Sequence, residues 1–275
     1  MPNHRIDTDT ALYCLLGNPV VHSLGPVMHN RAFACSHLNA VYLAFRVTNL
    51  EAAVTGIRSL GIKGASITLP HKSRVMEFLD ATDQTAANIG AVNTIINDSG
   101  RLVGKNSDTA GAMDALQEQT SIEDKRVLIL GAGGAARAIG FGIHGSGGDV
   151  TITNRSAAKG KKLAADLGGT FLSFRDMPGG RFDILINTTP VGMHPGIDAS
   201  PVPLELLKSE MVVMDIVYNP LETRLLKEAS RIGCKTIDGL AMFVNQGARQ
   251  FEWWTGEKAP VAVMKQAVRD CLGNS

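Results

Sequence analysis

Short apolar runs alternate along the first third of the chain with longer segments in which apolar residues recur at helical spacing. Residues 12–16 are one such run, and Gly17-Asn18-Pro19 after it predicts that a strand ends there in a turn. Strands separated by helices are typical of an α/β layer with a mostly parallel sheet. In chain order the pattern predicts a strand over 12–16, a helix over 26–38, a strand over 41–47, a helix over 50–60, a strand over 64–69, a helix over 72–79, and a hairpin over 91–96 and 101–104.

A second series of elements lies around and after a polar stretch at residues 118–126. Residues 127–130 are continuously apolar, as in a strand that is buried on both faces of a parallel sheet. A glycine-rich loop separates this strand from a helix of small residues. The expected elements are helices over 108–117 and 135–143, strands over 150–153, 183–186, 211–214 and 235–237, and helices over 240–251 and 260–271.

Length and composition narrow the class of protein. The 275 residues are long for one core and sufficient for two domains. A formal net charge of +1 and an aromatic content of 5% give no electrostatic or base-stacking argument for a nucleic acid. The balanced charge likewise gives no reason to expect a membrane surface as partner, and no apolar run is long enough to cross a bilayer. The small molecule that we expect as partner rests on the motifs described below.

The cysteines and the start of the chain bear on the compartment. None of the four cysteines forms a Cys-x-x-Cys pair or stands beside histidine at metal-ligand spacing. Isolated thiols of a reducing compartment are the simplest interpretation, and we expect no metal. Residues 1–10 are polar and lack the apolar core of a signal peptide. We expect a cytoplasmic protein, and the sequence leaves both a monomer and a homodimer open.

The loop Gly131-Ala132-Gly133-Gly134-Ala135 follows the buried strand and opens the next helix. Strand, glycine loop, helix and a second strand about twenty residues on form the order of a dinucleotide-binding site. Gly131 would permit the tight turn, and Gly133 would let a pyrophosphate approach the main chain. The N–H groups at the helix N-terminus would attract the phosphates. The alternative is a plain glycine turn between a strand and a helix.

The residues after the second strand of this unit distinguish two cofactors. An NAD site usually has Asp or Glu there, which accepts from the ribose 2′-hydroxyl. Asn154-Arg155-Ser156 and Lys159 stand there instead, without a carboxylate among them. Basic side chains suit a 2′-phosphate, so the sequence favours NADP. The alternative is that Arg155 and Lys159 are the solvated start of a helix.

Two charged residues are candidates for the chemistry of hydride transfer. Oxidation of a secondary alcohol needs a group that takes the hydroxyl proton, and a lysine can do so. Lys72 follows a strand and a turn, and Asp108 stands at a loop-to-helix junction. By spacing alone each could be an ordinary surface charge, and for an isolated lysine that explanation is the more frequent one.

A series of short motifs along nearly the whole chain resembles the shikimate dehydrogenase family. Their common order is more specific than any single motif. In chain order they are Gly17-Asn-Pro-Val-Val-His-Ser23, Ile67-Thr-Leu-Pro-His-Lys72, Gly90-Ala-Val-Asn93-Thr94, Asn106-Ser-Asp108, Gly131-Ala-Gly-Gly-Ala135, Asn154-Arg-Ser156, Asp215-Ile-Val-Tyr218 and Asp238-Gly-Leu-Ala-Met-Phe-Val-Asn-Gln246.

The resemblance implies an α/β protein of two domains that reversibly reduces 3-dehydroshikimate to shikimate in the chorismate pathway of aromatic amino acid biosynthesis. A substrate-binding domain over 1–107 would be completed by C-terminal helices over 241–275. A Rossmann-like domain over 108–240 would hold NADP.

The resemblance also implies roles for individual residues. Lys72 would be the acid/base group and Asp108 its partner. The implied contacts to substrate carboxylate or hydroxyls are Ser23, Thr68, Asn93, Tyr218 and Gln246. Those implied near the nicotinamide are Ile216 and Gly239, and we also expect Thr188 and Met242 to bind the cofactor.

Two positions depart from the family pattern, both in the substrate half. The family usually has His-Ser-x-Ser-Pro, and Gly25 stands here in place of the second serine; it usually has Asn where Ser66 stands. One lost hydrogen bond to a charged group costs roughly 1.5–3 kcal/mol. Gly25 and Ser66 therefore mark where the substrate preference can differ.

Three alternatives stay open at this point. One is a related enzyme for quinate or another cyclic hydroxy acid, with NAD as a possible cofactor. Another is a non-catalytic, regulatory NADP-binding protein, against which the pair Lys72 and Asp108 speaks. A third is another two-domain dehydrogenase, such as one acting on folate carriers, which the ordered motifs do not favour.

Overall fold

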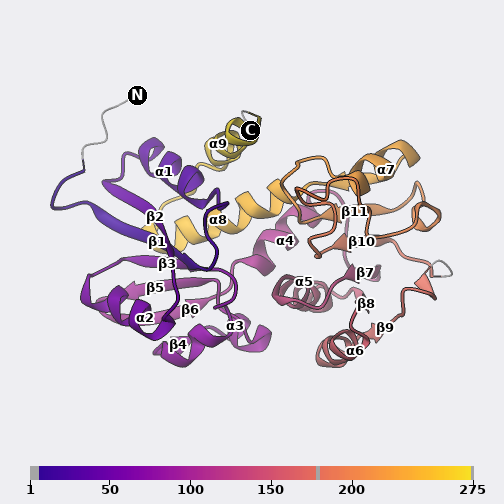
Figure 1. Cartoon of the computed structure of the whole chain (residues 1–275), viewed down its shortest axis with the longest axis horizontal. Coiled ribbons are helices and arrows are strands. Elements are labelled where there is room, and N and C mark those ends of the chain that lie inside the picture. The colour runs from indigo at the N-terminus through magenta and orange to yellow at the C-terminus, as the bar shows by residue number, and fades with distance from the viewer. Residues whose placement is uncertain (1–5, 178–179, 274–275) are drawn as a thin grey trace. The chain divides into compact units, whose positions relative to one another are not determined.

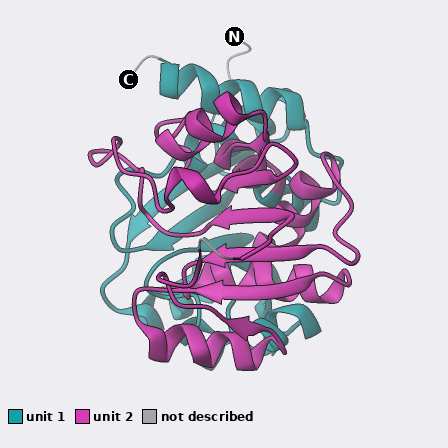
Figure 2. Cartoon of the chain, turned by 90° about the vertical axis from the view of Figure 1, so that its right-hand side faces the viewer, with its two compact units in different colours: residues 1–107, 246–275 teal, residues 108–245 magenta. Residues whose placement is uncertain are grey.

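The computed structural model describes residues 6–177 and 180–273 and divides into two compact units (Figure 2). Unit 1 comprises residues 1–107 and 246–275, and unit 2 comprises residues 108–245. The return to unit 1 lies at Gln246 rather than at residue 241, the position expected from the sequence. Helix α8 (Gly239–Thr255) runs through this boundary, and Met242 in its first turn packs into the core of unit 2. The helix therefore belongs to both units.

Unit 1 contains a six-stranded mixed sheet in the order β2-β1-β3-β5-β6-β4. Strand β1 pairs in parallel with β2 and β3, whereas β5 and β6 form an antiparallel hairpin, as the sequence predicts. The strands are β1 (Ala11–Gly17), β2 (Ala40–Arg46), β3 (Gly64–Ile67), β4 (Ala81–Thr82), β5 (Thr94–Asp98) and β6 (Arg101–Lys105).

Helices lie on both sides of this sheet (Figure 1), and alternate residues of its strands face the two sides. Cys14, Ala65 and Ile95 belong to an apolar core that also contains Val54 of helix α2 (Leu50–Ser59). On the other face, Tyr13 packs against Phe33 of α1 (Gly25–Cys35) and Trp254 of α8, with ring centroids 5.1 and 5.2 Å apart. Ser66 and Thr94, which are paired across β3 and β5, are the polar residues of this second face.

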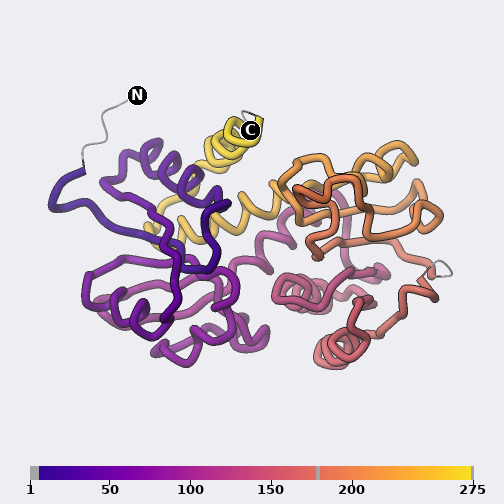
Figure 3. Tube along the Cα trace, viewed as in Figure 1, coloured from indigo at the N-terminus to yellow at the C-terminus, as the bar shows by residue number. Residues whose placement is uncertain are grey.

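The C-terminal helix α9 (Val261–Gly273) lies beside α1, so two segments far apart in the sequence pack together in unit 1 (Figure 3). Gly247 of α8 allows α8 to approach α1 closely, because a Cβ there would lie 2.1 Å from the methyl carbon of Met28. This explains how the last residues of the chain complete the first domain.

Unit 2 contains a six-stranded parallel sheet in the order β12-β11-β10-β7-β8-β9. The order reverses at β7, because the chain first adds β8 and β9 on one side and then β10 to β12 on the other. In such sheets ligands bind outside the carboxyl ends of the strands at this switch point. The strands are β7 (Arg126–Leu130), β8 (Asp149–Thr153), β9 (Thr170–Phe171), β10 (Ile184–Asn187), β11 (Val212–Asp215) and β12 (Lys235–Ile237).

Helices cover both faces of this sheet. Ile129 packs with Ile139 and Ile143 of α5 (Gly134–Gly145), and Leu128 on the opposite face packs with Leu225 of α7 (Arg224–Ile232). The remaining helices are α4 (Asp108–Gln117) and α6 (Ala157–Asp166). The two-domain α/β architecture expected from the sequence is confirmed.

Several short elements differ from the expectation. The helix expected over 72–79 is a shorter 3-10 helix, η1 (Arg74–Phe78). The pattern did not predict five other elements, which are α3 (Gln84–Ile89), η3 (Leu204–Leu206), β4, β9 and α7. The side chains of Asp83 and Thr223 cap α3 and α7, and Gly90 and Gly233 end them at positive φ. These capping residues are visible in the sequence and explain both helices.

Within residues 6–177 and 180–273, no helix is long and apolar enough to cross a membrane. In the same part of the chain, no group of His, Cys, Asp and Glu is arranged to hold a metal ion.

Candidate active site

The loop after β7 requires glycine and leaves its outer surface open. Gly131 has φ 116°, and a Cβ there would lie 2.5 Å from Oγ1 of Thr188. Gly133 and Gly134 are exposed, and apart from their chain neighbours and the backbone of their own helix no atom lies within 4 Å of the position that a Cβ would take at either residue. Main-chain N–H groups at the start of α5 are therefore accessible to a phosphate. These features fit the pyrophosphate of a dinucleotide.

Thr188, at the end of β10, lies beside this loop. Its main-chain N–H and its hydroxyl both donate to the carbonyl oxygen of Leu130, at 3.0 and 2.6 Å. The structure therefore brings Thr188 and Gly131 together at the switch point of the sheet.

The end of β8 is attached to the same loop, because the N–H of Gly131 donates to the carbonyl oxygen of Thr153 at 2.8 Å. Asn154 follows, and its Nδ2 donates to the carbonyl oxygen of Ser156, the N-cap of α6. Arg155 and Lys159 are exposed, and neither takes part in an ion pair within the part of the chain that the structure describes. Two basic side chains are thus available next to the glycine loop.

The carboxyl end of β11 is fixed by a buried carboxylate, Asp215. It accepts hydrogen bonds from the Asn187 side chain at 2.9 Å, from Thr223 Oγ1 at 2.7 Å and from the N–H of Val217 at 3.0 Å. Burial raises the pKa of Asp215 to about 6, although these three donors act in the opposite direction. These hydrogen bonds hold the main chain directly after β11, the segment that contains Ile216 and Tyr218.

Gly239 allows the start of α8 to approach this segment. A Cβ at Gly239 would lie 2.5 Å from the carbonyl oxygens of both Ile216 and Val217. The ring of Tyr218 stacks on Phe243 at a centroid distance of 4.8 Å, and burial raises the pKa of the Tyr218 phenol. Met242 is buried in the core of unit 2. The last two sequence motifs thus meet within unit 2.

In unit 1, Lys72 lies in a turn that is attached to the segment before β5. The N–H of Val92 donates to the carbonyl oxygen of Lys72 at 2.8 Å, and the N–H of Ile67 donates to that of Asn93 at 2.8 Å. Thr68 is half-buried at the end of β3, where its N–H donates to the carbonyl oxygen of Leu16. Lys72, Thr68 and Asn93 are therefore brought together by main-chain bonds.

Asn93 is the centre of a buried polar network. Its Oδ1 accepts from the main-chain N–H of Ser107 at 2.8 Å, and its Nδ2 donates to Ser107 Oγ at 3.0 Å. Ser107 Oγ also lies 3.3 Å from Oε1 of Gln246. Asp108, the next residue after Ser107, is in the first turn of α4 and is 7% exposed. The network brings two predicted substrate contacts, Asn93 and Gln246, to one place.

The two positions that depart from the family pattern both lie near Tyr42. The N–H of Gly25 donates to Ser23 Oγ at 3.2 Å, and a Cβ on Gly25 would lie 3.4 Å from Cε1 of Tyr42. Ser66 is buried and hydrogen-bonded to the Tyr42 hydroxyl and to Gln250. Sequence reasoning missed Gln250 and Ser107. Gln250 stands four residues after Gln246 on the same helix, and Ser107 lies inside a quoted motif, so both had a signal.

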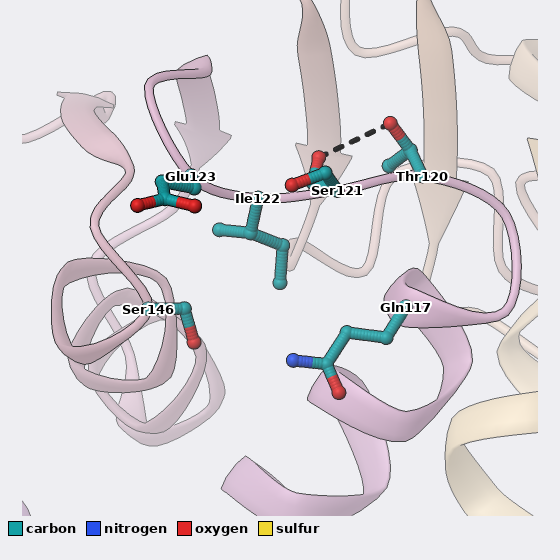
Figure 4. A pocket seen from close by; sticks show the side chains of 6 residues that line it. All are labelled: Gln117, Thr120, Ser121, Ile122, Glu123 and Ser146. Atoms are coloured by element: carbon teal, nitrogen blue, oxygen red, sulfur yellow. Dashed lines mark hydrogen bonds between the residues drawn. The ribbon is translucent and has the colours of Figure 1, made fainter.

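One polar pocket lies elsewhere on unit 2 (Figure 4). It has a volume of about 560 Å³ and is lined by Gln117, Thr120, Ser121, Ile122, Glu123 and Ser146. Ile122 and Glu123 precede β7, whereas the glycine loop follows it, so the pocket lies at the other end of the strand. Among these lining residues Glu123 alone is ionisable, and the pocket offers none of the features of the glycine loop.

Family models match three stretches of the chain. Residues 15–95 match the shikimate dehydrogenase substrate binding domain, residues 114–240 match shikimate / quinate 5-dehydrogenase, and residues 239–269 match the shikimate 5′-dehydrogenase C-terminal domain. A shikimate dehydrogenase (NADP(+)) of Moorella thermoacetica is 44% identical over 98% of this chain and 97% of its own length. The chain belongs to the shikimate dehydrogenase family.

Solved structures of this family share the fold. A shikimate dehydrogenase in complex with NADP+ is 43% identical, with a TM-score of 0.94 and 98% of each chain covered. The enzyme of Thermus thermophilus in complex with NADP(H) and shikimate is 35% identical, with a TM-score of 0.89, over 94% of this chain and 99% of its own. The family resemblance and the fold class expected from the sequence are confirmed.

Proposed function

We propose that this protein is an NADP-dependent shikimate dehydrogenase that reversibly reduces 3-dehydroshikimate to shikimate. The observation that supports it most is that the turn carrying Lys72 is hydrogen-bonded through its main chain to the segment of Asn93, whose amide belongs to a buried polar network of the kind that suits ring hydroxyls. The NADP(+)-dependent relative at 44% identity supports the same assignment.

Unit 2 would hold the cofactor. The open main chain at Gly133 and Gly134 suits the pyrophosphate, and the exposed Arg155 and Lys159 suit a 2′-phosphate. Asn154 and Ser156 hold the segment that carries these two basic residues. The further proposed contacts to the cofactor are Ala132, Ala135, Thr188, Ile216, Gly239 and Met242. Bound NADPH supplies the hydride.

The residues of the remaining motifs would bind and polarise the substrate. Lys72 would donate a proton to the ketone oxygen during reduction and take it back during oxidation. Its ammonium would stabilise the negative charge that develops on that oxygen. Asp108 would orient Lys72 and accept from a ring hydroxyl. The side chains proposed to hold the carboxylate and the other hydroxyls are those of Ser23, Thr68, Asn93, Tyr218 and Gln246.

The remaining predictions follow from this assignment. The partner would be a small cyclic hydroxy acid, and the reaction would belong to the chorismate pathway. None of the four cysteines, all within the described residues, forms a disulfide, and two of them are buried, which supports a reducing compartment such as the cytoplasm.

A cofactor and substrate panel tests the proposal. Purified protein is assayed for reduction of NADP+ and NAD+ by shikimate, quinate and aromatic hydroxy acids. We expect kcat/KM to be highest for shikimate with NADP+. Failure with every cyclic hydroxy acid, in folded protein that binds NADP+, would overturn the substrate assignment.

A further inference from the structure

A series of hydrogen bonds links Ser66, Gln250 and Asn93, and the donor and the acceptor of each bond can be assigned. Gln250 is 2% exposed, and its Nε2 lies 3.2 Å from the carbonyl oxygen of Asn93 and 2.9 Å from Thr94 Oγ1. Because a main-chain carbonyl only accepts, the Nε2 of Gln250 must face it. The Oε1 of Gln250 therefore faces Ser66, 2.8 Å away, and the Ser66 hydroxyl is the donor.

This assignment determines what Ser66 can offer to a ligand. A serine hydroxyl has one proton, and here it is given to Gln250. The Tyr42 hydroxyl also interacts with the Ser66 hydroxyl. Ser66 can then only accept a further hydrogen bond. Asparagine, which the family usually has at this position, offers a donor as well.

Gln250 also fixes the orientation of Asn93. It holds the Asn93 carbonyl directly, and it donates to Thr94 Oγ1, which in turn donates to Asn93 Oδ1 at 2.8 Å. With Oδ1 facing Thr94 and the N–H of Ser107, the Nδ2 of Asn93 is directed toward Ser107 Oγ. One side chain thus controls two positions of the proposed substrate site.

The space around these hydrogen bonds is filled. Ser66 is 6% exposed and Tyr42 is 1% exposed. Ser66 is hydrogen-bonded to Gln250, and Tyr42 interacts with Ser66. A larger side chain at residue 66 would have to displace the Gln250 amide, because protein cores have few voids. The residues at positions 66 and 250 must therefore fit each other.

We propose that Gln250 is a positioning residue of the substrate site, which acts through Ser66 and Asn93 and supplies the amide that the family usually carries at position 66. The proposal rests on the proposed function. Because Ser66 gives its proton to Gln250, residue 66 would accept a hydrogen bond from a ring hydroxyl of the substrate. It would not donate one to a negatively charged substrate oxygen.

A double-mutant cycle with Gln250→Ala, Ser66→Asn and the double variant tests the pairing. We expect each single substitution to raise KM for shikimate about tenfold, the effect of one or two lost hydrogen bonds, with KM for NADP+ unchanged. In the double variant the amide introduced at position 66 occupies the space left by Gln250, and KM for shikimate returns to within about threefold of the parent value. Gln266→Ala, at an exposed glutamine of α9, is the matched control.

A purely structural role predicts different results. Additive increases of KM in the double variant would overturn the pairing, and so would equal changes in KM for NADP+. If the parent does not oxidise shikimate at all, the proposed function fails. The pairing is then decided by melting temperatures: a double variant more stable than the sum of the single losses supports it, and additive losses overturn it.

Discussion

Asn187 and Asp215, the last residues of the adjacent strands β10 and β11, are joined by a hydrogen bond of 2.9 Å from Nδ2 to Oδ1. The same amide holds the Val191 carbonyl, and the same carboxylate accepts from Thr223. Asp215 therefore ties the segment that begins with Thr188 to the one that begins with Ile216. Both segments carry proposed cofactor contacts.

The burial of Asp215 predicts a pH dependence of stability. Its pKa is about 6 in the folded protein, against an ordinary value of 3.8, because burial disfavours the carboxylate. The folded protein thus binds this proton more tightly than the unfolded chain does. Its stabilising effect is complete below about pH 4 and is lost as the pH rises through about 6. A difference of about two pH units corresponds to about 3 kcal/mol.

Asp215→Asn removes this titration. Relative to the variant, we expect the free energy of unfolding of the parent to fall by about 3 kcal/mol between about pH 4 and about pH 7.5, measured by urea titration at several pH values. A constant difference between parent and variant across this range would show that the pKa of Asp215 is not raised.

Lys72→Ala tests the proton-transfer group. General acid–base catalysis contributes roughly 10²- to 10⁴-fold, so we expect kcat for shikimate oxidation to fall by at least about a hundredfold. NADP+ binding, followed by fluorescence, should not change. Lys63→Ala, at an exposed lysine of the same unit, is the control. Parent-like turnover in Lys72→Ala would assign the proton transfer to another residue.

Arg155→Ala tests the recognition of the 2′-phosphate. One or two charge-assisted hydrogen bonds are lost, so we expect KM for NADP+ to rise by about ten- to a hundredfold and KM for NAD+ to change little. Arg231→Ala provides a matched control, because this exposed arginine lies in the last turn of α7, which packs against β11 and β12. Equal effects on both cofactors would contradict the role of Arg155.

Gly25→Ser tests the missing hydroxyl. A Cβ at Gly25 would lie 3.3 Å from Ser23 Oγ and 3.4 Å from Tyr42 Cε1, which a small shift accommodates. We expect the added donor to lower KM for shikimate by about tenfold or more, the effect of one hydrogen bond to a carboxylate. Gly25→Ala adds the same Cβ without the hydroxyl. If both variants behave alike, residue 25 does not contact the carboxylate.

Sequence reasoning identified most of the fold because hydrophobic periodicity and turn residues agree over long stretches. The apolar strand before Gly131 and the small residues of α5 are examples, and they place the glycine loop correctly. The basic residues after β8 were equally visible. Short elements were harder to predict: α3 has six residues, and η1 follows directly after the turn at Lys72.

The side-chain networks were not accessible in this way. Ser66 and Gln250 are 184 residues apart, and only the pairing of β3 with β5 and the packing of α8 bring them together. The same holds for Asn187, Asp215 and Thr223, whose common role depends on the order of strands in the sheet. Residue types indicate which groups are present, whereas tertiary structure determines which of them donate to each other.

The central claim is tested most directly by following deuterium. Shikimate is labelled at the carbinol carbon that is oxidised, and the transfer of the label to NADP+ is measured. The account predicts that the reduced cofactor carries the label, that 3-dehydroshikimate is the other product, and that Lys72→Ala slows the transfer. Reduced cofactor without deuterium, or no reduction of NADP+ by shikimate in protein that binds both, would contradict it.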